Sequence, residues 1–177
     1  PSYIHRSTRP YDIDEFERVS ATRVDGDASK PITNFSYMQM WHSDNGFHAF
    51  FTRYNYPAAR TICFMHSPDG RQWSQWQRLA AIDEGHYQVS GIGDSKLGSM
   101  FNYHPKGKGL NWRTNLYYIE TPDNGATWQT VDGRALALPL TDDRNNALIH
   151  DYEAEGLNVY LKDLRFDSQD RPVLLYI

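Results

Sequence analysis

Short stretches in which apolar and polar residues alternate run along most of the chain, and such alternation predicts β-strands. Turn-forming sequences separate them, among them SDNG at 43–46, GDSK at 93–96 and DSQDRP at 167–172. Only residues 10–18 resemble a helix, and a short turn fits that stretch equally well. We therefore expect an all-β chain, with strands at 36–41, 47–54, 61–66, 75–79, 86–92, 98–104, 114–120, 127–131, 157–166 and 172–177.

One phrase in this pattern occurs twice. SPDGRQW at 67–73 is followed fifty-four residues later by TPDNGATW at 121–128, and each copy comes after three stretches of strand pattern. A repeat of about fifty residues that contains four antiparallel strands is typical of a β-propeller blade. We therefore expect whole blades at 32–80 and 83–134, a half blade at 1–31 and a partial blade at 145–177.

Three such blades do not close a ring, because propellers usually have roughly four to eight. The predicted fold is therefore about three four-stranded antiparallel blades of a larger β-propeller, a ring of about seven. The remaining blades are expected to come from the rest of the polypeptide.

The two copies of the phrase share residues that suit a tight turn between strands. A carboxylate can accept hydrogen bonds from turn amides, a glycine can adopt a positive φ, and a tryptophan can pack between sheets. We expect these positions to be structural: Ser67, Asp69, Gly70 and Trp73 in the first copy, and Thr121, Asp123, Gly125 and Trp128 in the second.

Composition narrows the classes of function. Aromatic residues make up 14% of the chain, which favours strands over helices. The formal net charge of -4 and the lack of a Lys/Arg run give no reason to expect a nucleic-acid partner. No apolar stretch has the length of a membrane span, and the single Cys63 excludes an internal disulfide.

The first predicted hairpin offers one candidate site. If its SDNG turn is centred on residue 45, Tyr37 and Arg53 lie opposite each other on one face. The pair can serve chemistry, or it can be a packed aromatic ring with a guanidinium stacked on it. The pattern leaves both interpretations open.

The second predicted hairpin offers another. If its GDSK turn is centred near residue 95, His86 lies opposite His104, and Gln88 lies opposite Asn102. Buried polar groups need partners or a ligand. This set is therefore either a binding site or an internally satisfied hydrogen-bond network.

Other polar residues carry weaker signals. Arg113 opens a strand and can bind an anion or pair with Glu120, whereas the acidic loop of Asp151, Glu153 and Glu155 is typical of a solvated segment. The chain contains no metal-ligand spacing, nucleophile elbow or phosphate loop, so we expect no metal and no cofactor.

Several stretches resemble one known family. They are YIHRSTRPYDIDEFERV, FFTRY, EGHYQVSG, RTNLYYIETPDNGATW and VYLKDLRFDSQDRPVLLY, and the repeated phrase resembles that family's Asp-box. The chain is similar to the BNR-repeat, sialidase-like β-propellers, which include ulvan lyases and enzymes that cleave rhamnosyl-glucuronate. The resemblance implies an anionic poly- or oligosaccharide substrate and a secreted or periplasmic protein.

The resemblance also implies a site. In those lyases a Tyr on an inner strand and an Arg on the next strand act with an upstream pair of histidines. The Tyr and Arg correspond to Tyr37 and Arg53, whereas the histidine pair would precede Pro1. The implied reaction is β-elimination at a uronic acid, in which Arg53 neutralises the carboxylate and Tyr37 transfers a proton. His86 is the further catalytic candidate, and the substrate-binding candidates are Gln88, Asn102, His104 and Arg113.

Two other functions stay open. One is a glycoside hydrolase of the same propeller family; a sialidase fits less well, because no Glu falls on an opposed inner-strand position. The other is a propeller that binds sugars without cleaving them, for which aromatic platforms and polar edges suffice. Fold alone does not choose among these functions.

Overall fold

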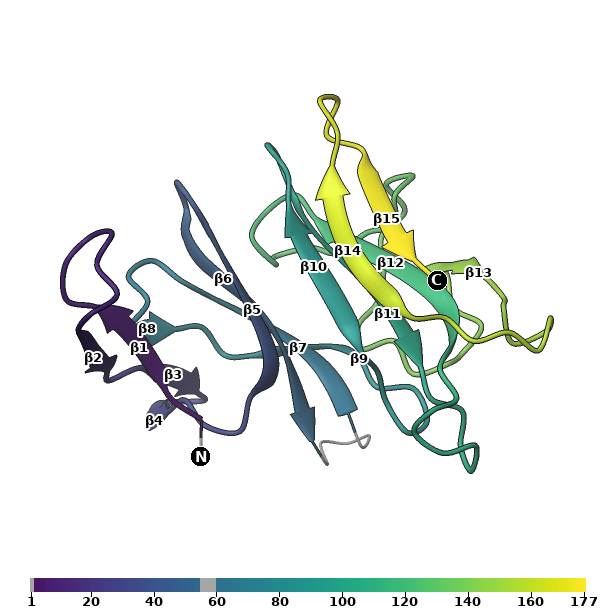
Figure 1. The fold of residues 1–177 in the computed structure, drawn as a ribbon, viewed down its shortest axis with the longest axis horizontal. Coiled ribbons are helices and arrows are strands. Elements are labelled where there is room, and N and C mark those ends of the chain that lie inside the picture. The colour runs from purple at the N-terminus through teal and green to yellow at the C-terminus, as the bar shows by residue number, and fades with distance from the viewer. Residues whose placement is uncertain (1, 55–59) are drawn as a thin grey trace.

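The computed structural model describes residues 2–54 and 60–177, and within those ranges it contains strands and turns but no helix (Figure 1). The all-β prediction is confirmed. A helix at 10–18 is wrong: a turn leads there into strand β2 (Phe16–Val19), which pairs with β1 (Ile4–Ser7). No helix in the described part of the chain is long and apolar enough to cross a membrane.

Two four-stranded antiparallel sheets form the centre of the molecule. The first contains β5 (Ser36–Ser43), β6 (Gly46–Tyr54), β7 (Arg60–Ser67) and β9 (Gln77–Ala80), in that order. The second contains β10 (Gln88–Ile92), β11 (Leu97–Tyr103), β12 (Thr114–Thr121) and β13 (Leu148–His150). Each sheet is a simple up-and-down meander, as expected for a propeller blade.

The fourth strand of the second sheet is not where the sequence pattern placed it. Residues 127–131 make only isolated bridges, through Gln129, to Glu120 and Ala135. The chain then turns back at Gly133, whose amide donates to the Thr130 carbonyl, and β13 takes the edge position beside β12. The second sheet therefore runs on to residue 150, beyond the expected limit at 134.

Smaller sheets flank this pair. Strands β3 (Thr22–Asp25), β4 (Ala28–Pro31) and β8 (Gln72–Trp73) form one of them, and β8 runs parallel to β3. The hairpin of β14 (Leu161–Phe166) and β15 (Pro172–Tyr176) forms another, beside β10.

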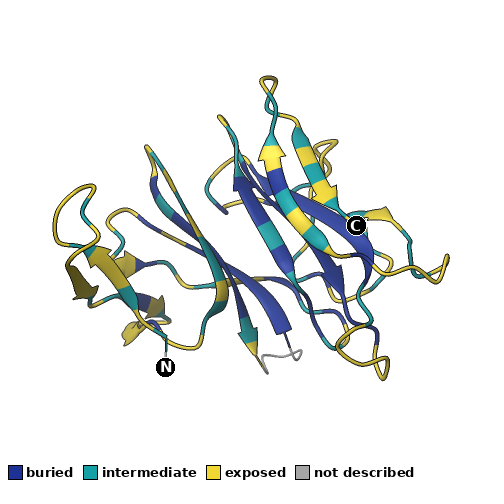
Figure 2. Cartoon of the chain, in the orientation of Figure 1, coloured by how far each residue is buried: buried dark blue, intermediate teal, exposed yellow. Residues whose placement is uncertain are grey.

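Apolar residues fill the spaces between these layers. Strands β6, β7, β11 and β12 are buried on both faces, whereas β1, β2 and β15 carry exposed residues (Figure 2). On β6, Phe50 faces the second sheet, while Phe51 packs with Trp73 on the side of the N-terminal strands. On β12, Tyr118 packs with Leu164 of β14. Alternation thus supplies both faces of each inner sheet with core residues.

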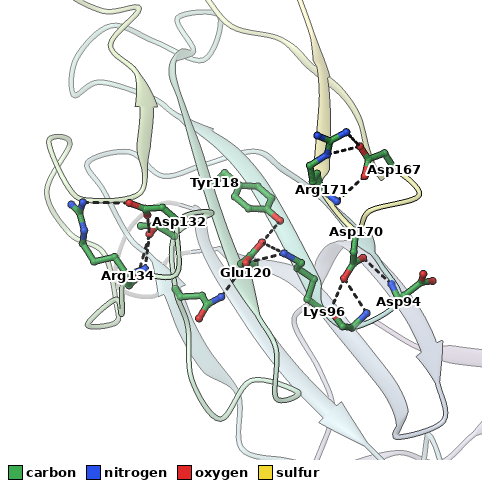
Figure 3. Close-up of polar contacts among 12 residues, drawn as sticks. Asp94, Lys96, Tyr118, Glu120, Asp132, Arg134, Asp167, Asp170 and Arg171 are labelled. Atoms are coloured by element: carbon green, nitrogen blue, oxygen red, sulfur yellow. Dashed lines mark hydrogen bonds and ion pairs between the residues drawn. The ribbon is translucent and has the colours of Figure 1, made fainter.

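Polar contacts fasten the β14–β15 hairpin to the second sheet (Figure 3). The Asp170 carboxylate accepts hydrogen bonds from the backbone amides of Asp94 and Ser95, at 2.9 and 3.1 Å, and so caps the β10–β11 turn. Nearby, the Lys96 ammonium lies 3.2 Å from the buried Glu120 carboxylate. Both contacts join residues that are far apart in sequence.

The two repeated turns satisfy their own polar groups. In the second, Asp123 Oδ1 accepts from the Thr127 amide at 2.7 Å and from the Thr121 hydroxyl at 2.9 Å, and Gly125 has a φ of +93°. The Trp128 indole donates to Gln77 of the first sheet at 2.8 Å. In the first turn, Ser67, Asp69 and Gly70 make the matching bonds, and the Trp73 indole donates to the Gly70 carbonyl.

Candidate functional site

The register of the two hairpins decides which side chains meet. Ser43 pairs with Gly46, and Ile92 pairs with Leu97, so each turn is centred half a residue earlier than the sequence analysis assumed. Because successive side chains point to opposite faces of a strand, this small shift moves every expected partner to the other face.

The predicted opposition of Tyr37 and Arg53 is wrong. The register shifts between the pairs Ser36–Thr52 and Gln39–Phe50, and Tyr37 lies in this irregular stretch with a φ of +50°. The Arg53 guanidinium lies 3.5 Å from the centre of the Trp76 ring. The alternative of a guanidinium stacked on an aromatic ring therefore describes Arg53, with Trp76 in place of Tyr37.

The predicted pairs in the second hairpin are wrong for the same reason. Gln88 pairs with Phe101, so His86 and Gln88 lie on one face and Asn102 and His104 on the other. The His104 ring instead contacts Tyr87, with 5.2 Å between the ring centres.

His86 is a core residue whose two ring nitrogens are both used. Nε2 accepts from the Ile82 amide at 2.9 Å, and Nδ1 donates to the Asn102 carbonyl at 2.8 Å. Burial lowers the pKa of His86 to about 3, and it is fully shielded from solvent. This geometry leaves no nitrogen for a substrate, and the catalytic role expected of His86 gains no support from it.

Gln88 and Asn102 connect neighbouring elements. Gln88 donates from Nε2 to the Tyr37 carbonyl at 3.3 Å, which joins β10 to the irregular stretch of β5. Asn102 donates to the Val159 carbonyl at 2.8 Å and accepts from the Tyr87 amide at 3.3 Å. Both amides are nearly buried and position other residues.

A different group of side chains gathers where strands β5, β7, β10 and β12 begin and β6 and β11 end, along the lower edge of the two sheets in Figure 1. The Tyr54 hydroxyl lies 3.4 Å from the Tyr37 hydroxyl, and the Tyr37 and Tyr87 rings meet edge to face at 5.3 Å. We call this group the tyrosine–arginine rim; its members are Tyr37, Tyr54, Tyr87, Arg60, His104, Arg113 and Tyr160.

Two guanidinium groups flank the central tyrosine of the rim. Arg113 lies 4.6 Å from the centre of the Tyr87 ring and 4.8 Å from that of Tyr160. Arg60 lies 5.5 Å from the Tyr87 ring centre. Tyr37 is 52% exposed and Arg113 is partly exposed, whereas Arg60 is only 6% exposed. Tyr37 and Arg113 are therefore within reach of a ligand, and Arg60 supplies charge from beneath.

A close backbone contact holds Arg60 in place. Gly85 has a φ of +93°, and a Cβ atom on it would lie 2.3 Å from the Arg60 carbonyl oxygen. The His86 amide donates to that carbonyl at 3.0 Å, and Arg60 Nη1 donates to the Glu84 carbonyl at 3.2 Å. Only glycine fits this approach.

The rim changes the ionisation of its members. The hydrogen bond between Tyr37 and Tyr54 raises the pKa of Tyr37, although a hydrogen bond with Tyr87 and the positive charge of Arg60 act in the opposite direction. Burial lowers the pKa of His104 to about 4, and the charges of Arg60 and Arg113 contribute to this. At neutral pH, Tyr37 is therefore a phenol and His104 a neutral imidazole.

Several polar atoms of the rim lack a well-aligned partner in the described part of the chain. Arg60 Nε is shielded from solvent and makes no hydrogen bond there, and the shielded ring nitrogens of His104 make only a poorly aligned contact with the Gly109 backbone. Such groups are rare in folded proteins and mark places where a ligand or water completes the structure. No group of three His, Cys, Asp or Glu side chains among residues 2–54 and 60–177 is arranged to hold a metal ion.

Sequence analysis missed Tyr54, Arg60, Tyr87 and Tyr160. Tyr87 lies between His86 and Gln88, and with the correct turn centre the alternation rule assigns it to the face of His104. Arg60 and Tyr160 come together with it only through packing between strands, for which the sequence offers no local signal.

A hollow of about 510 Å³ lies elsewhere on the described surface. Its lining includes Arg78, Trp128, Leu136 and Leu138, and it shares no residue with the rim. Trp128 is only 5% exposed and its indole donates to Gln77, so the ring is not available to a sugar. This hollow belongs to the second repeated turn.

Comparison with known proteins places the chain in a family. Residues 1–177 match the family described as "BNR repeat-containing family member". The chain belongs to this family. No curated protein matches its sequence significantly.

This BNR-repeat chain is also similar in fold to solved structures. One is described as a new family of polysaccharide lyase, an ulvan lyase, bound to -[GlcA(1-4)Rha3S]-; it has a TM-score of 0.71 and 21% identity over 96% of the chain. A second ulvan lyase structure has a TM-score of 0.70 and 21% identity over the same share. The chain spans 41% of the length of each. These similarities confirm the propeller fold expected from the repeats.

Proposed function

We propose that this chain is part of a carbohydrate-active propeller that cleaves uronic-acid-containing polysaccharide by β-elimination. The observation that carries the proposal is the rim, where a half-exposed Tyr37 phenol lies beside a tyrosine flanked by two guanidinium groups. Membership of the BNR-repeat family and the fold shared with ulvan lyases support it.

Elimination needs the sugar carboxylate to be neutralised, because this makes the proton on C5 acidic. A guanidinium suits this task, since it can donate two parallel hydrogen bonds to a carboxylate. We assign the contact to Arg113, which is partly exposed, and the supporting charge to the buried Arg60. Arg53, the residue expected from the sequence, is the alternative.

Tyr37 is the proton-transfer group in this proposal. A base, which we assign to the histidine pair that the family resemblance places upstream of Pro1, takes the proton from C5. The electrons of the C5–H bond form a double bond between C4 and C5, and the C4–O bond breaks. The leaving oxygen then takes a proton. Because the raised pKa keeps Tyr37 protonated at neutral pH, the phenol is suited to donate that proton. When the substrate carboxylate binds, it offsets part of the positive charge of Arg113, which would otherwise stabilise a phenolate. Proton donation is therefore the role that fits Tyr37 best.

The substrate bears on where the protein acts. A polysaccharide is too large to enter a cell intact, so we propose a secreted or periplasmic location. We also propose that further blades of the same polypeptide complete the ring. The native mass of the polypeptide, measured by mass spectrometry, should then be well above the 20.5 kDa of these 177 residues.

Product analysis tests the reaction class. The polypeptide, at the length its gene encodes, is incubated with glucuronate–rhamnose polysaccharide, and ultraviolet absorbance reports the conjugated double bond of an unsaturated uronate. Elimination produces this absorbance. New reducing ends without absorbance would show a glycoside hydrolase, and calorimetric binding without either product would show a sugar-binding propeller.

The variant Tyr37→Phe ties the reaction to the rim. We expect it to lower kcat by about a hundredfold or more, because proton transfer to the leaving oxygen is lost. Its melting temperature should stay close to that of the wild type, since the hydroxyl is at the surface. Activity within a factor of about two of the wild type would remove Tyr37 from the mechanism.

A further inference from the structure

The loop 105–112, which connects β11 to β12, continues the rim. It begins directly after His104 and ends directly before Arg113, and both of these residues contact the Tyr87 ring. In Figure 1 it lies at the lower edge, where β11 ends and β12 begins. A saccharide that reaches Arg113 is therefore also beside this loop.

The loop is held in a defined shape. The Lys106 amide donates to the Asp83 carboxylate at 3.3 Å, and the Gly107 amide donates to the Glu84 carboxylate at 2.9 Å. The carbonyl oxygen of Leu110 accepts from Arg113 Nε at 3.3 Å. The two carboxylates thus bind loop amides, and neither forms an ion pair with Lys106 or Lys108.

The loop concentrates cationic side chains, although the carboxylates of Asp83 and Glu84 bind its backbone amides. Lys106 and Lys108 are exposed, and within the described residues neither forms an ion pair; the same holds for Lys162, whereas Lys30 and Lys96 are paired. Together with Arg113, Lys106 and Lys108 place three cations in eight residues of a chain whose net charge is -4. Such a concentration favours an anionic ligand.

Trp112 adds two features that suit a ligand. The Lys108 ammonium lies 5.5 Å from the centre of its ring, which restrains the ammonium on the side of the loop. The indole nitrogen of Trp112 is shielded from solvent and has no acceptor among the described residues. A buried donor without an acceptor is unusual, and a water molecule or a ligand oxygen would complete it.

We propose that Lys106, Lys108 and Trp112 form a second anion subsite, which binds a neighbouring sulfate ester or carboxylate of the saccharide held at the rim. The inference rests on the proposed function for the identity of the ligand. The subsite sets which polysaccharides bind, and the rim carries out the chemistry on a neighbouring unit.

Binding measurements test the subsite separately from the reaction. The probes are a glucuronate–rhamnose oligosaccharide with 3-sulfated rhamnose and the same oligosaccharide after desulfation, each titrated by calorimetry. The double variant Lys106→Ala/Lys108→Ala should raise Kd for the sulfated probe about tenfold, as expected for two partly exposed charge contacts. The matched control Lys162→Ala removes one exposed positive charge from β14 and should leave Kd unchanged.

The two probes identify the anion. A loss confined to the sulfated probe assigns a sulfate ester to the subsite, and an equal loss with both probes assigns a carboxylate. Trp112→Phe keeps the ring but removes the N–H donor, and we expect it to raise Kd about threefold.

A double variant that binds both probes as tightly as Lys162→Ala overturns the subsite. This result does not contradict the proposed function, because product formation by the wild type is measured in a separate assay. Conversely, a wild type that binds the probes but forms no unsaturated product refutes the lyase proposal. The Kd of the double variant still tests the subsite in that case.

Discussion

The two repeated turns and the tyrosine–arginine rim are both rich in polar side chains, but they use them differently. In the second repeated turn, Asp123 accepts hydrogen bonds from Thr121 and Thr127 of the same turn. At the rim, His104 and Arg60 keep shielded nitrogens that make no well-aligned hydrogen bond within the described residues, and Tyr37 has an unusual backbone conformation. Polar groups that are satisfied within a turn indicate structure, whereas unsatisfied ones near a strained residue indicate a site.

Lowering the pH should produce the largest difference between the rim and the repeated turns, in the pH range over which each loses stability. The folded-state pKa values of His86 and His104, about 3 and about 4, are below the value of about 6.5 for an unfolded histidine. As the pH falls from about 6.5 to about 4, only the unfolded chain gains these protons. The free energy of unfolding should then fall by up to about 1.4 kcal/mol per pH unit for each histidine.

The repeated turns should respond in a lower pH window. Burial raises the pKa of Asp123, but the hydrogen bonds from Thr127 and Thr121 lower it by a larger amount, so the net shift of the pKa is downward. Its stabilisation is present above the unfolded value of about 4 and is lost only as the pH falls below it. Urea unfolding across this range measures the free energy of unfolding of two variants. His104→Gln should reduce the loss of stability above pH 4, and Asp123→Asn should alter only the loss below it. The reverse result would contradict the comparison.

A methyl group at Gly85 should damage the rim alone. In Gly85→Ala the new Cβ would meet the Arg60 carbonyl oxygen at 2.3 Å, and the residue would also have to keep a positive φ. We expect a loss of about 3 kcal/mol or more in the free energy of unfolding. Gly133→Ala is the control, because it has a φ of +80° but open space around it, and should cost about 1 kcal/mol.

Removing arginines should distinguish the rim from its surroundings. We expect Arg113→Ala to lower kcat/KM by about tenfold to a hundredfold, since a charge-assisted contact to the carboxylate is lost. Arg53→Ala should mainly lower stability, because its guanidinium stacks on Trp76. Steady-state kinetics and thermal unfolding of both variants measure this, and a kinetic effect confined to Arg53→Ala would return the carboxylate to that residue.

The smallest effect should come from the repeated turn. Asp123→Ala removes the acceptor for Thr121 and Thr127, and we expect it to cost about 1–2 kcal/mol of stability, as loss of a cap does. Activity per folded molecule should stay at the wild-type level. A selective loss of activity would mean that the turn contributes to the site.

Much of the fold was predictable because its signals are local. Alternation located the central strands within a few residues, and SDNG and GDSK marked their turns. The fourth strand of the second sheet was not, because two segments share one edge of β12. Gln129 makes only a bridge to Glu120, and the strand itself is formed further on, where β13 pairs with Leu116 and Tyr117.

The sequence by itself determined the all-β class, the repeat and the chemistry of the turns, since these depend on neighbouring residues. Only the tertiary structure decided which side chains come together at the candidate site. A half-residue difference in two turn centres exchanged the faces of the hairpins, and the register shift between Ser36 and Gln39 takes Tyr37 out of the regular alternation. Because a strand reverses its side-chain direction at every residue, two nearly equal local registers place entirely different groups together, and packing across the sheets selects between them.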